Sequence, residues 1–378
     1  MSPWRVPSRD RRCRRSCWRC DHGGIRWCHS HGPGSGSFRA MKFGVLQFFS
    51  WPGRRVPLAT VYQRALERID IMDRSGYDCV WLAEHHFTTY SVCPSVHLMA
   101  MHVADRTRNL RIGTGVSLAA LYHPLRLAEE VALLDVLSGG RVNWGAGRGF
   151  DPGEFRAFGV PAEESQERFR EAVDIVVAAW RDARLNWSGP HWQFKDVEVL
   201  PKPHQQPHPP VWVAASSPPA IEWAASRGYS IMLDPHCSLG DLGLKRELYR
   251  RELARHGHAF AGRDLPMARL IAVAETAVEA RRVAEQGAAW TVSAYANKDN
   301  AGKAISAGLL SKSDDAATGD AAAVERYVRE VMIHGTPAQV ADQIRALQDD
   351  IGLDYLLCAP VSHTSFMLLT EQVLPKFL

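Results

Sequence analysis

The sequence contains no long hydrophobic run. None of its apolar stretches reaches the roughly 18 to 20 residues that a helix needs to cross a bilayer, so we expect no membrane-spanning segment. No G-x-G-x-x-G pattern follows the first predicted strand, which argues against a dinucleotide-binding domain of the doubly wound type. With 46% hydrophobic and 23% charged residues, the composition is ordinary for a water-soluble globular protein.

Most of the chain also lacks an excess of positive charge. The net charge is +4, but residues 1–40 contain nine Arg and two Asp and carry +7 by themselves, which leaves −3 for the remainder. A mildly acidic body has no electrostatic footprint for nucleic acid, so we expect no nucleic-acid partner.

The first 40 residues differ from the rest in composition. They contain four of the eight cysteines, with three histidines nearby, a set that would suit zinc. However, the cysteine spacing gives no repeated C-x-x-C pair, and the segment has neither a helix or strand pattern nor the apolar core of a secretory signal. We interpret residues 1–40 as a basic, disordered extension or as translated sequence upstream of a true start at Met41. Residues 41–378 are predicted to form one domain.

The remaining cysteines are scattered through this domain and have no disulfide-like spacing. They are Cys79, Cys93, Cys237 and Cys358. Isolated thiols of this kind are typical of a reducing compartment, so we expect a cytoplasmic protein.

From Met41 onward, short apolar runs alternate with amphipathic helical segments. The predicted strands are 43–49, 79–82, 110–117, 141–146, 211–214, 229–233, 268–274 and 353–358. Eight alternations of strand and helix favour an α/β fold with a single parallel, TIM-like (β/α)8 barrel over an open sheet.

Two segments do not fit this alternation and are predicted to be insertions. Residues 184–210 are rich in Trp, His and Pro and are interpreted as a surface excursion. Residues 291–334 are too long for a simple connection and are rich in Ala, Gly, Ser, Asp and Lys. Long loops of this kind either cover an active site or are disordered, and we predict a mobile lid.

The segments that follow the strands carry the candidate chemistry, because the active site of such a barrel lies at the carboxyl ends of its strands. After the second strand come Glu84, His85 and His86, where a carboxylate and two imidazoles offer proton transfer near neutral pH. A metal site is the alternative, although adjacent histidines on an extended segment point in opposite directions and rarely share an ion. A structural role for either histidine also stays open.

Glycines and one cation follow the third and fourth strands. Residues 113–115 (Gly-Thr-Gly) permit close approach of a flat ligand, and Arg148 lies within the glycine-rich run 145–149. A guanidinium group beside accessible backbone N–H groups suits a phosphate or carboxylate. The alternative is an ion pair between this arginine and Asp151 or Glu154.

After the fifth strand, Ser216 and Ser217 precede two prolines and a predicted helix. Ser217 is predicted to be the N-cap, with Pro at the first helical position. A helix N-terminus binds phosphate through its free N–H groups and its dipole, whereas capping without a ligand is the simpler alternative. Together with the arginine after the neighbouring strand, this turn predicts a phosphate-bearing ligand.

In this order, these segments resemble the bacterial luciferase family of flavin-dependent monooxygenases, and most of all its alpha subunit. The similarity covers nearly everything from Met41 to the C-terminus. It rests on the markers MKFG, GYDCVWLAEHHF, LRIGTGV, YHP, LLDVLSGGRVNWGAGRG, FRAFG, PPVWVAASS, EWAA and GTP. The resemblance implies a barrel, reduced FMN delivered by a separate flavin reductase, O2 as co-substrate, and a homodimer.

The resemblance also implies roles for individual residues. His85 matches the catalytic histidine beside the flavin, with Glu84 as a supporting acid and either Glu84 or His86 fixing its orientation. Arg148 matches the arginine that holds the FMN phosphate.

The remaining implied contacts surround the flavin. Ser217 and the backbone of Ser216 match the phosphate-binding turn. Gly115 and Val116 occupy the place of a non-prolyl cis peptide under the flavin ring. Residues 291–334 fall where the family has its mobile lid.

The sequence departs from the luciferase pattern at three positions. Gly147 stands beside the flavin where the alpha subunit has a reactive cysteine, which argues against light emission. Gln166 replaces a second phosphate-binding arginine, for which Arg168 is a candidate substitute. Ala220 replaces a phosphate-contacting threonine.

The sequence therefore predicts a two-component monooxygenase that uses reduced FMN and O2 to oxygenate a small organic substrate, an aldehyde or another apolar compound, through a flavin peroxide. The alternatives are a hydride-transferring oxidoreductase that uses a deazaflavin, a flavin-binding protein without activity, and a metal-dependent hydrolase.

Overall fold

The structure is a computed structural model that describes residues 41–233, 235–295 and 320–378. The predictions for residues 1–40 and for the central part of the predicted lid, residues 296–319, lie outside the described residues. The described strands are β1 (Lys42–Gln47), β2 (Cys79–Leu82), β3 (Arg111–Thr114), β4 (Ser117–Leu118), β5 (Val142–Gly147), β6 (Leu185–Ser188), β7 (Gln193–Val197), β8 (Val211–Ala214), β9 (Ser230–Met232), β10 (Met267–Val273), β11 (Ile333–Gly335) and β12 (Tyr355–Pro360).

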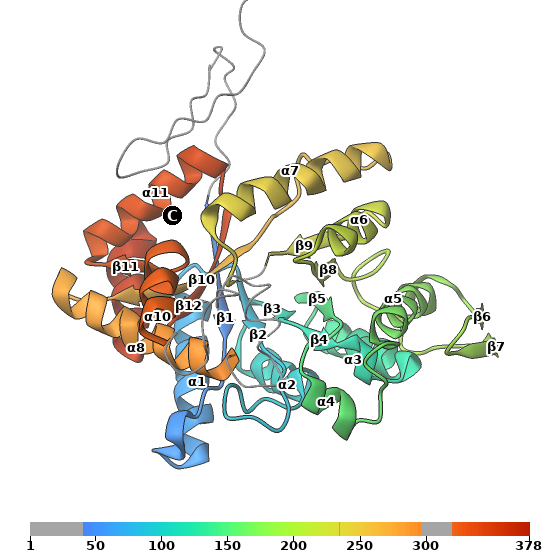
Figure 1. Ribbon diagram of the computed structural model, residues 1–378. Coiled ribbons are helices and arrows are strands. Elements are labelled where there is room, and N and C mark those ends of the chain that lie inside the picture. The colour runs from blue at the N-terminus through green and yellow to red at the C-terminus, as the bar shows by residue number, and fades with distance from the viewer. Residues whose placement is uncertain (1–40, 234, 296–319) are drawn as a thin grey trace, which may run out of the picture. The chain divides into compact units, whose positions relative to one another are not determined.

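Eight of these strands form the predicted parallel barrel (Figure 1). Hydrogen-bonded neighbours follow the order β10-β12-β1-β2-β3-β5-β8-β9, and every pairing along this path is parallel. The ring closes between β9 and β10 through an isolated parallel bridge from Leu233 to Met267. The barrel predicted from the alternation of strands and helices is confirmed.

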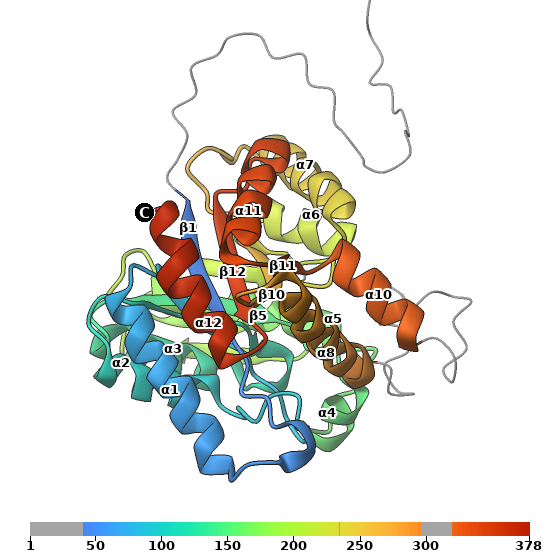
Figure 2. The ribbon, with the colours of Figure 1, turned by 90° about the vertical axis from the view of Figure 1, so that its left-hand side faces the viewer.

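Helices surround these strands. They are α1 (Leu58–Arg74), α2 (Val96–Arg106), α3 (Pro124–Leu137), α4 (Pro152–Ala157), α5 (Ser165–Arg181), α6 (Pro218–Ser226), α7 (Leu239–Arg255), α8 (Ala277–Tyr295), α10 (Asp320–Glu330), α11 (Pro337–Ile351) and α12 (His363–Leu368), with short turns η1 (Pro52–Arg54), η2 (Ala119–Leu121), η3 (Leu369–Val373) and η4 (Leu374–Lys376). In Figure 2, α1, α2 and α3 lie on one side of the strands, and α6, α7 and α11 lie on the other.

The strand side chains divide into two apolar clusters. Along β2 and just beyond it, Cys79, Trp81 and Ala83 face the barrel interior, whereas Val80 and Leu82 pack in the layer between barrel and helices. This period of two is the expected pattern of a strand that is buried on both faces. It also decides which residues after each strand face the active end of the barrel.

The excursion at residues 184–210 is more than a surface loop. Its first half forms an antiparallel hairpin of β6 and β7. In its second half, the backbone N–H and side-chain amide of Gln205 donate to the carboxylate of buried Asp135, at 2.8 and 2.7 Å. Gln205 Oε1 also accepts a bond from Arg111 Nη2 at 3.1 Å. Most residues of this half are exposed or partly exposed and lie outside helices and strands, so the predicted surface excursion is confirmed, with Gln205 as its contact to buried groups.

The predicted loop at residues 291–334 is wrong at both of its edges. Helix α8 continues to Tyr295, and α10 and β11 occupy residues 320–330 and 333–335. Helix α10 packs against α8 with Tyr327 and Val328 buried, and Val331, directly after the helix, is buried as well. Apolar residues three to four positions apart form one helical face, so this part of the segment folds as a helix of the barrel shell.

Candidate active site

The barrel interior has a floor of large rings beneath its carboxyl ends. The indoles of Trp81 and Trp212 meet edge to face, with ring centroids 5.4 Å apart. Gly113 is the register neighbour of Trp81, and a Cβ atom at Gly113 would lie only 2.3 Å from Cε3 of that indole. The missing side chain at this glycine makes room for the ring below the site.

Above this floor, four neighbouring strands carry only very small side chains. The next inward-facing positions, two residues further along each strand, are Ala83, Gly115, Gly147 and Ala214. A layer of glycines and alanines above a bulky floor lets a flat ligand approach the strand ends closely.

One side of this layer is filled by Val116. A Cβ atom at Gly147 would lie 2.3 Å from Cγ2 of Val116 and 3.7 Å from Cβ of Ala214. The peptide bond between Gly115 and Val116 is cis, as the resemblance implied. Gly147 is thus a glycine because Val116 occupies the space that a side chain would need.

Glu84 and His86 form a buried pair next to this layer. The Glu84 side chain is fully buried, and its Oε1 atom lies 3.1 Å from His86 Nε2. The same carboxylate accepts the Tyr122 hydroxyl at 3.0 Å and the Leu118 N–H at 3.4 Å. Burial and the nearby Glu84 charge raise the pKa of Tyr122 far above its usual value, so its phenol keeps the proton that it donates.

His85 faces a different carboxylate, that of Glu154 on α4. His85 Nδ1 lies 3.8 Å from Glu154 Oε1, and the same oxygen accepts the backbone N–H of His86 at 2.9 Å. From the sequence, Glu154 is a candidate partner only for the arginine of the glycine-rich run, whereas the structure places it beside His85. The two histidines thus point to two different acids, as expected for neighbours on an extended segment.

Aromatic rings surround the imidazole of His85. Tyr90 and Phe150 meet it edge to face, with centroids 5.1 and 5.8 Å away, and Phe48 meets Tyr90 at 5.2 Å. These rings give the histidine end of the site an apolar boundary.

Arg148 follows β5 as a half-buried cation. Within the described residues, no carboxylate lies at ion-pair distance from its guanidinium group, and the partner it has is the Ser165 hydroxyl, which accepts from Nη1 at 3.1 Å. Burial lowers the pKa of Arg148, since desolvation disfavours the charged form. The alternative of an ion pair with Asp151 or Glu154 is therefore excluded, and the arginine is left available for an anionic ligand.

The turn before α6 offers donors other than those predicted. Ser217 is the N-cap, as expected, but its side chain caps no backbone N–H. Pro218 and Pro219 have no N–H, and the next two N–H groups, of Ala220 and Ile221, both donate to the Ser217 carbonyl. The predicted free N–H groups of the first turn are thus missing, which the proline pair in the sequence already signalled.

The donors that remain at this turn belong to Ser216 and Ser217 themselves. Both residues are exposed, and no partner for their backbone N–H groups or hydroxyls is found within the described residues. They can therefore bond a ligand oxygen. By contrast, Arg168 Nε donates to Glu164 at 2.8 Å, and its guanidinium lies over the Trp192 ring. Arg168, the candidate substitute for the arginine missing at Gln166, therefore already has a carboxylate partner.

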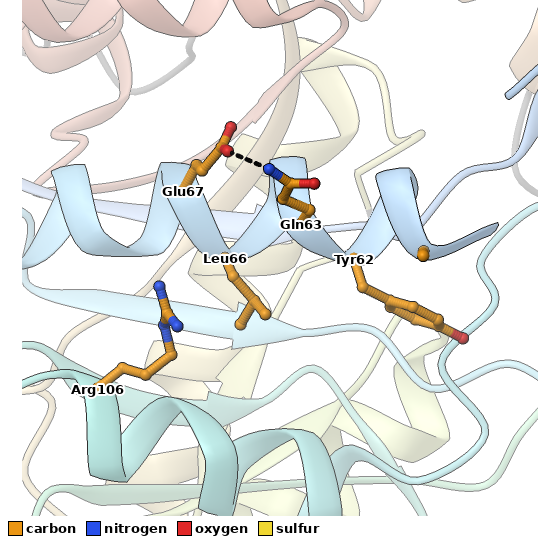
Figure 3. Close-up of a pocket in the computed structure, with 6 residues that line it drawn as sticks. Tyr62, Gln63, Leu66, Glu67 and Arg106 are labelled. Carbon is orange, nitrogen blue, oxygen red and sulfur yellow. Dashed lines mark hydrogen bonds between the residues drawn. The ribbon is translucent and has the colours of Figure 1, made fainter. Parts of the chain in front are cut away.

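No group of three potential metal ligands occurs among the residues described. One pocket lies away from this site. A groove of about 560 Å³ runs along the outer surface between α1 and α2 and is lined by Tyr62, Leu66 and Arg106, among others (Figure 3). None of the candidate residues lines this groove, so it belongs to the helix shell.

Comparison with known protein families identifies the chain. The model of the luciferase-like monooxygenases matches residues 41–354. The chain belongs to the luciferase-like monooxygenase family. The resemblance seen in the sequence motifs is thereby confirmed, and so is the flavin-dependent monooxygenase class of the family.

Individual relatives of this luciferase-like protein differ in the cofactor that their names give. The oxygenase component of the flavin-dependent trigonelline monooxygenase of Acinetobacter baylyi is 34% identical over 48% of this chain and 50% of the relative. The monooxygenase RslO1 of Streptomyces bottropensis superposes with a TM-score of 0.75 and 28% identity, over 89% of this chain and all of that one. A coenzyme F420-dependent tetrahydromethanopterin reductase of Methanopyrus kandleri shares the fold at 18% identity and a TM-score of 0.69, over 90% of this chain and 100% of its own.

No helix in the described parts of the chain combines the length and the apolar content that crossing a membrane requires.

Proposed function

We propose that this luciferase-like protein is the oxygenase component of a two-component system, which uses reduced FMN and O2 to oxygenate a small apolar molecule. The observation that carries the proposal is Arg148, a half-buried cation with no carboxylate partner in the described residues. A desolvated charge without an opposite charge beside it is costly, and a bound phosphate would compensate it. The arginine follows β5, at the same end of the barrel as His85 on the β2 side.

The residues at the strand ends fit FMN. Arg148 and the free donors of Ser216 and Ser217 would hold its phosphate. Gly115, Val116 and Gly147 would lie against its ring, because the layer they form has no side chain larger than valine. The bound reduced flavin supplies the activation of O2, which no protein side chain provides.

His85 is proposed as the general acid and base of the reaction. It follows β2, its ring packs against Tyr90 and Phe150, and Glu154, whose Oε1 lies 3.8 Å from its Nδ1, would orient the ring. The Glu84–His86 pair supports the same loop from the other side. A buried carboxylate behind a histidine is the usual way in which a protein fixes ring orientation and tautomer.

The substrate is proposed to be an aldehyde-like or other apolar organic compound. The rings of Phe48, Tyr90 and Phe150 around His85 offer an apolar surface and few polar groups. Such a wall also excludes water from the reacting centre.

A flavin reductase and a second copy of the chain are the proposed protein partners, in the cytoplasm. The outer faces of α2 and α3 expose Leu98, Leu133 and Leu137, which are 76%, 48% and 58% exposed. Large exposed apolar side chains on neighbouring helices are typical of an interface. Sedimentation of the wild type and of Leu133→Arg tests this, with a dimer expected for the first and a monomer for the second.

Anaerobic titration with reduced FMN, followed by addition of O2 and a panel of apolar aldehydes and ketones, tests the proposed activity. We expect saturable binding of reduced FMN and O2 consumption coupled to substrate oxygenation. His85→Ala should slow oxygenation far more than it weakens FMN binding, whereas His102→Ala, an exposed histidine on α2, should resemble the wild type. Binding and hydride transfer with a reduced deazaflavin, in the absence of FMN binding, would instead establish the F420-type activity. Binding of FMN without any turnover would point to a flavin-binding protein that lacks activity.

A further inference from the structure

The two-residue strand β4 determines where Val116 lies. β4 directly follows Val116 and, within the described residues, pairs with Ala146 and Gly147 of β5 alone. A strand this short gains little from backbone pairing. Since the Val116 side chain fills the space beside Gly147, the groups that fix β4 also fix this wall of the site.

Side chains hold β4 from two directions. The Ser117 hydroxyl and Nε2 of His97 on α2 are 2.9 Å apart, and both residues are buried, with exposed fractions of 0% and 6%. The N–H of Leu118 donates to Oε2 of Glu84 at 3.4 Å. Buried hydrogen bonds of this kind are costly to lose because the remaining group stays desolvated.

His97 is itself held by Glu130 on α3. Its Nδ1 atom lies 3.0 Å from Glu130 Oε2. The hydrogen bond from His97 lowers the pKa of Glu130, with help from Arg126 and against the effect of burial. The carboxylate therefore stays ionised and accepts the Nδ1 proton, while Nε2 on the other side of the ring lies within hydrogen-bond distance of the Ser117 hydroxyl.

This serine–histidine–acid chain has the bonding order of a hydrolase triad, but its serine is inaccessible. Ser117 has no exposed surface, so no substrate carbonyl can reach its hydroxyl. Ser117 therefore cannot act as a nucleophile. The three hydrogen-bonded residues instead fix the position of β4.

The same histidine also packs against Tyr122, which bonds the Glu84–His86 pair. The Tyr122 ring packs edge to face on His97, with centroids 5.4 Å apart, and the Tyr122 hydroxyl donates to Glu84. Glu84 in turn pairs with His86. His97 thus contacts Ser117, the chain neighbour of Val116, and Tyr122, the hydrogen-bond donor to Glu84.

We propose that His97 is a positioning residue of the flavin site, which sets the placement of Val116 under the ring and of the Glu84–His86 pair beside it. Ser117 and Glu130 are its two anchors. The inference rests on the proposed function, because it assigns a flavin to the space that Val116 bounds. It concerns a residue behind the site, with no contact to the cofactor.

The test compares His97→Leu, Ser117→Ala and their double variant with the matched control His102→Leu, which changes an exposed histidine on the same helix. We expect each single variant to weaken binding of reduced FMN about tenfold, the effect of one lost buried hydrogen bond. The double variant should be no weaker than His97→Leu. At saturating FMN, the fraction of consumed O2 that appears in product should fall, and the visible spectrum of bound FMN should shift. A merely structural defect would change neither in the folded protein.

Glu130 gives a second, milder pair of variants. Glu130→Gln keeps an acceptor for His97 Nδ1 and should behave as wild type, whereas Glu130→Ala should resemble His97→Leu. If His97→Leu does not fold, these two Glu130 variants test the positioning role of His97. Variants whose FMN affinity, coupling and spectrum all equal those of His102→Leu would overturn the positioning role. Failure of the wild type and His102→Leu alike to bind FMN would refute the proposed function instead.

Discussion

His85 and Glu154 meet across the active end of the barrel, with Nδ1 and Oε1 3.8 Å apart. The same carboxylate oxygen accepts the backbone N–H of His86 at 2.9 Å, and the Glu154 side chain is only 3% exposed. One buried acid on α4 therefore bonds the backbone that follows His85 and lies within ion-pair distance of its ring. This links the orientation of the proposed acid and base to the position of a short helix after β5.

Glu154→Gln should separate these two roles. The amide keeps an oxygen that can accept the His86 N–H, but it removes the charge that orients His85. We expect substrate oxygenation to fall about tenfold, while the affinity for reduced FMN stays within about threefold of the wild type. Single-turnover oxygenation and FMN titration measure the two quantities. Glu163→Gln, which changes an exposed acid nearby, is the control, and equal oxygenation rates for the two variants would contradict the role of Glu154.

Arg148→Met should weaken cofactor binding without lowering the stability of the apoprotein. The guanidinium has no carboxylate partner in the described residues, and burial lowers its pKa, so the apoprotein bears the cost of a desolvated charge. A charge-assisted bond to phosphate contributes roughly 1.5 to 3 kcal/mol, so we expect FMN affinity to fall about 10- to 100-fold.

The stability of the apoprotein supplies the independent check on Arg148. Thermal unfolding without FMN should give a melting temperature for Arg148→Met equal to or above that of the wild type, since a buried charge is replaced by an apolar chain. Riboflavin, which lacks the phosphate, should bind both proteins equally. If the wild type bound riboflavin much more tightly than Arg148→Met does, this arginine would not act on the phosphate.

Gly147→Ala and Val116→Ala should compensate one another. A Cβ atom at Gly147 would lie 2.3 Å from Val116 Cγ2, so the single Gly147→Ala variant is overpacked and should lose about 1 to 3 kcal/mol of stability. The double variant removes the clashing methyl groups and should recover most of this loss. Urea unfolding of the four proteins measures the coupling, and purely additive effects would argue against the contact.

The sequence alone was sufficient for the barrel and for the histidine loop. Eight apolar runs, each followed by a helical segment, leave few topologies, and β12 at residues 355–360 lies close to the predicted strand at 353–358. Glu84 and His85 could be placed at the active end because their position after β2 is local information. These predictions depend on periodicity and on chain order, which a single sequence contains.

The partnerships across the site could not be predicted in the same way. Glu154 is far from His85 in the sequence, and nothing in residues 151–154 distinguishes a partner of His85 from a partner of Arg148. Helix α10 is a different case, because Val324, Tyr327, Val328 and Val331 have helical spacing. The surrounding Ala-, Gly- and Ser-rich composition obscured that signal, although alanine itself favours helix.

Asp73→Asn should destabilise the fold at neutral pH and have less effect in acid. The Asp73 carboxylate accepts the backbone N–H groups of Arg108, Asn109 and Leu110 at 2.8 to 3.2 Å. Burial alone would raise the pKa of Asp73, but these three N–H groups outweigh it and lower the pKa below its usual value. A carboxylate with a lowered pKa in the folded state contributes stability above its unfolded pKa of about 3.9, and this contribution is lost as the pH falls through the folded value.

We therefore expect Asp73→Asn to cost roughly 1 kcal/mol at pH 7, a value reduced for solvent screening, and clearly less at pH 3. Urea unfolding at the two pH values measures the difference, with Asp105→Asn, an exposed aspartate at the end of α2, as the control. Asp73 anchors the loop between α2 and β3 to α1, far from the strand ends that carry the site. FMN affinity at pH 7 should consequently be unchanged. An equal cost at both pH values would mean that the amide geometry, rather than the charge, holds this loop.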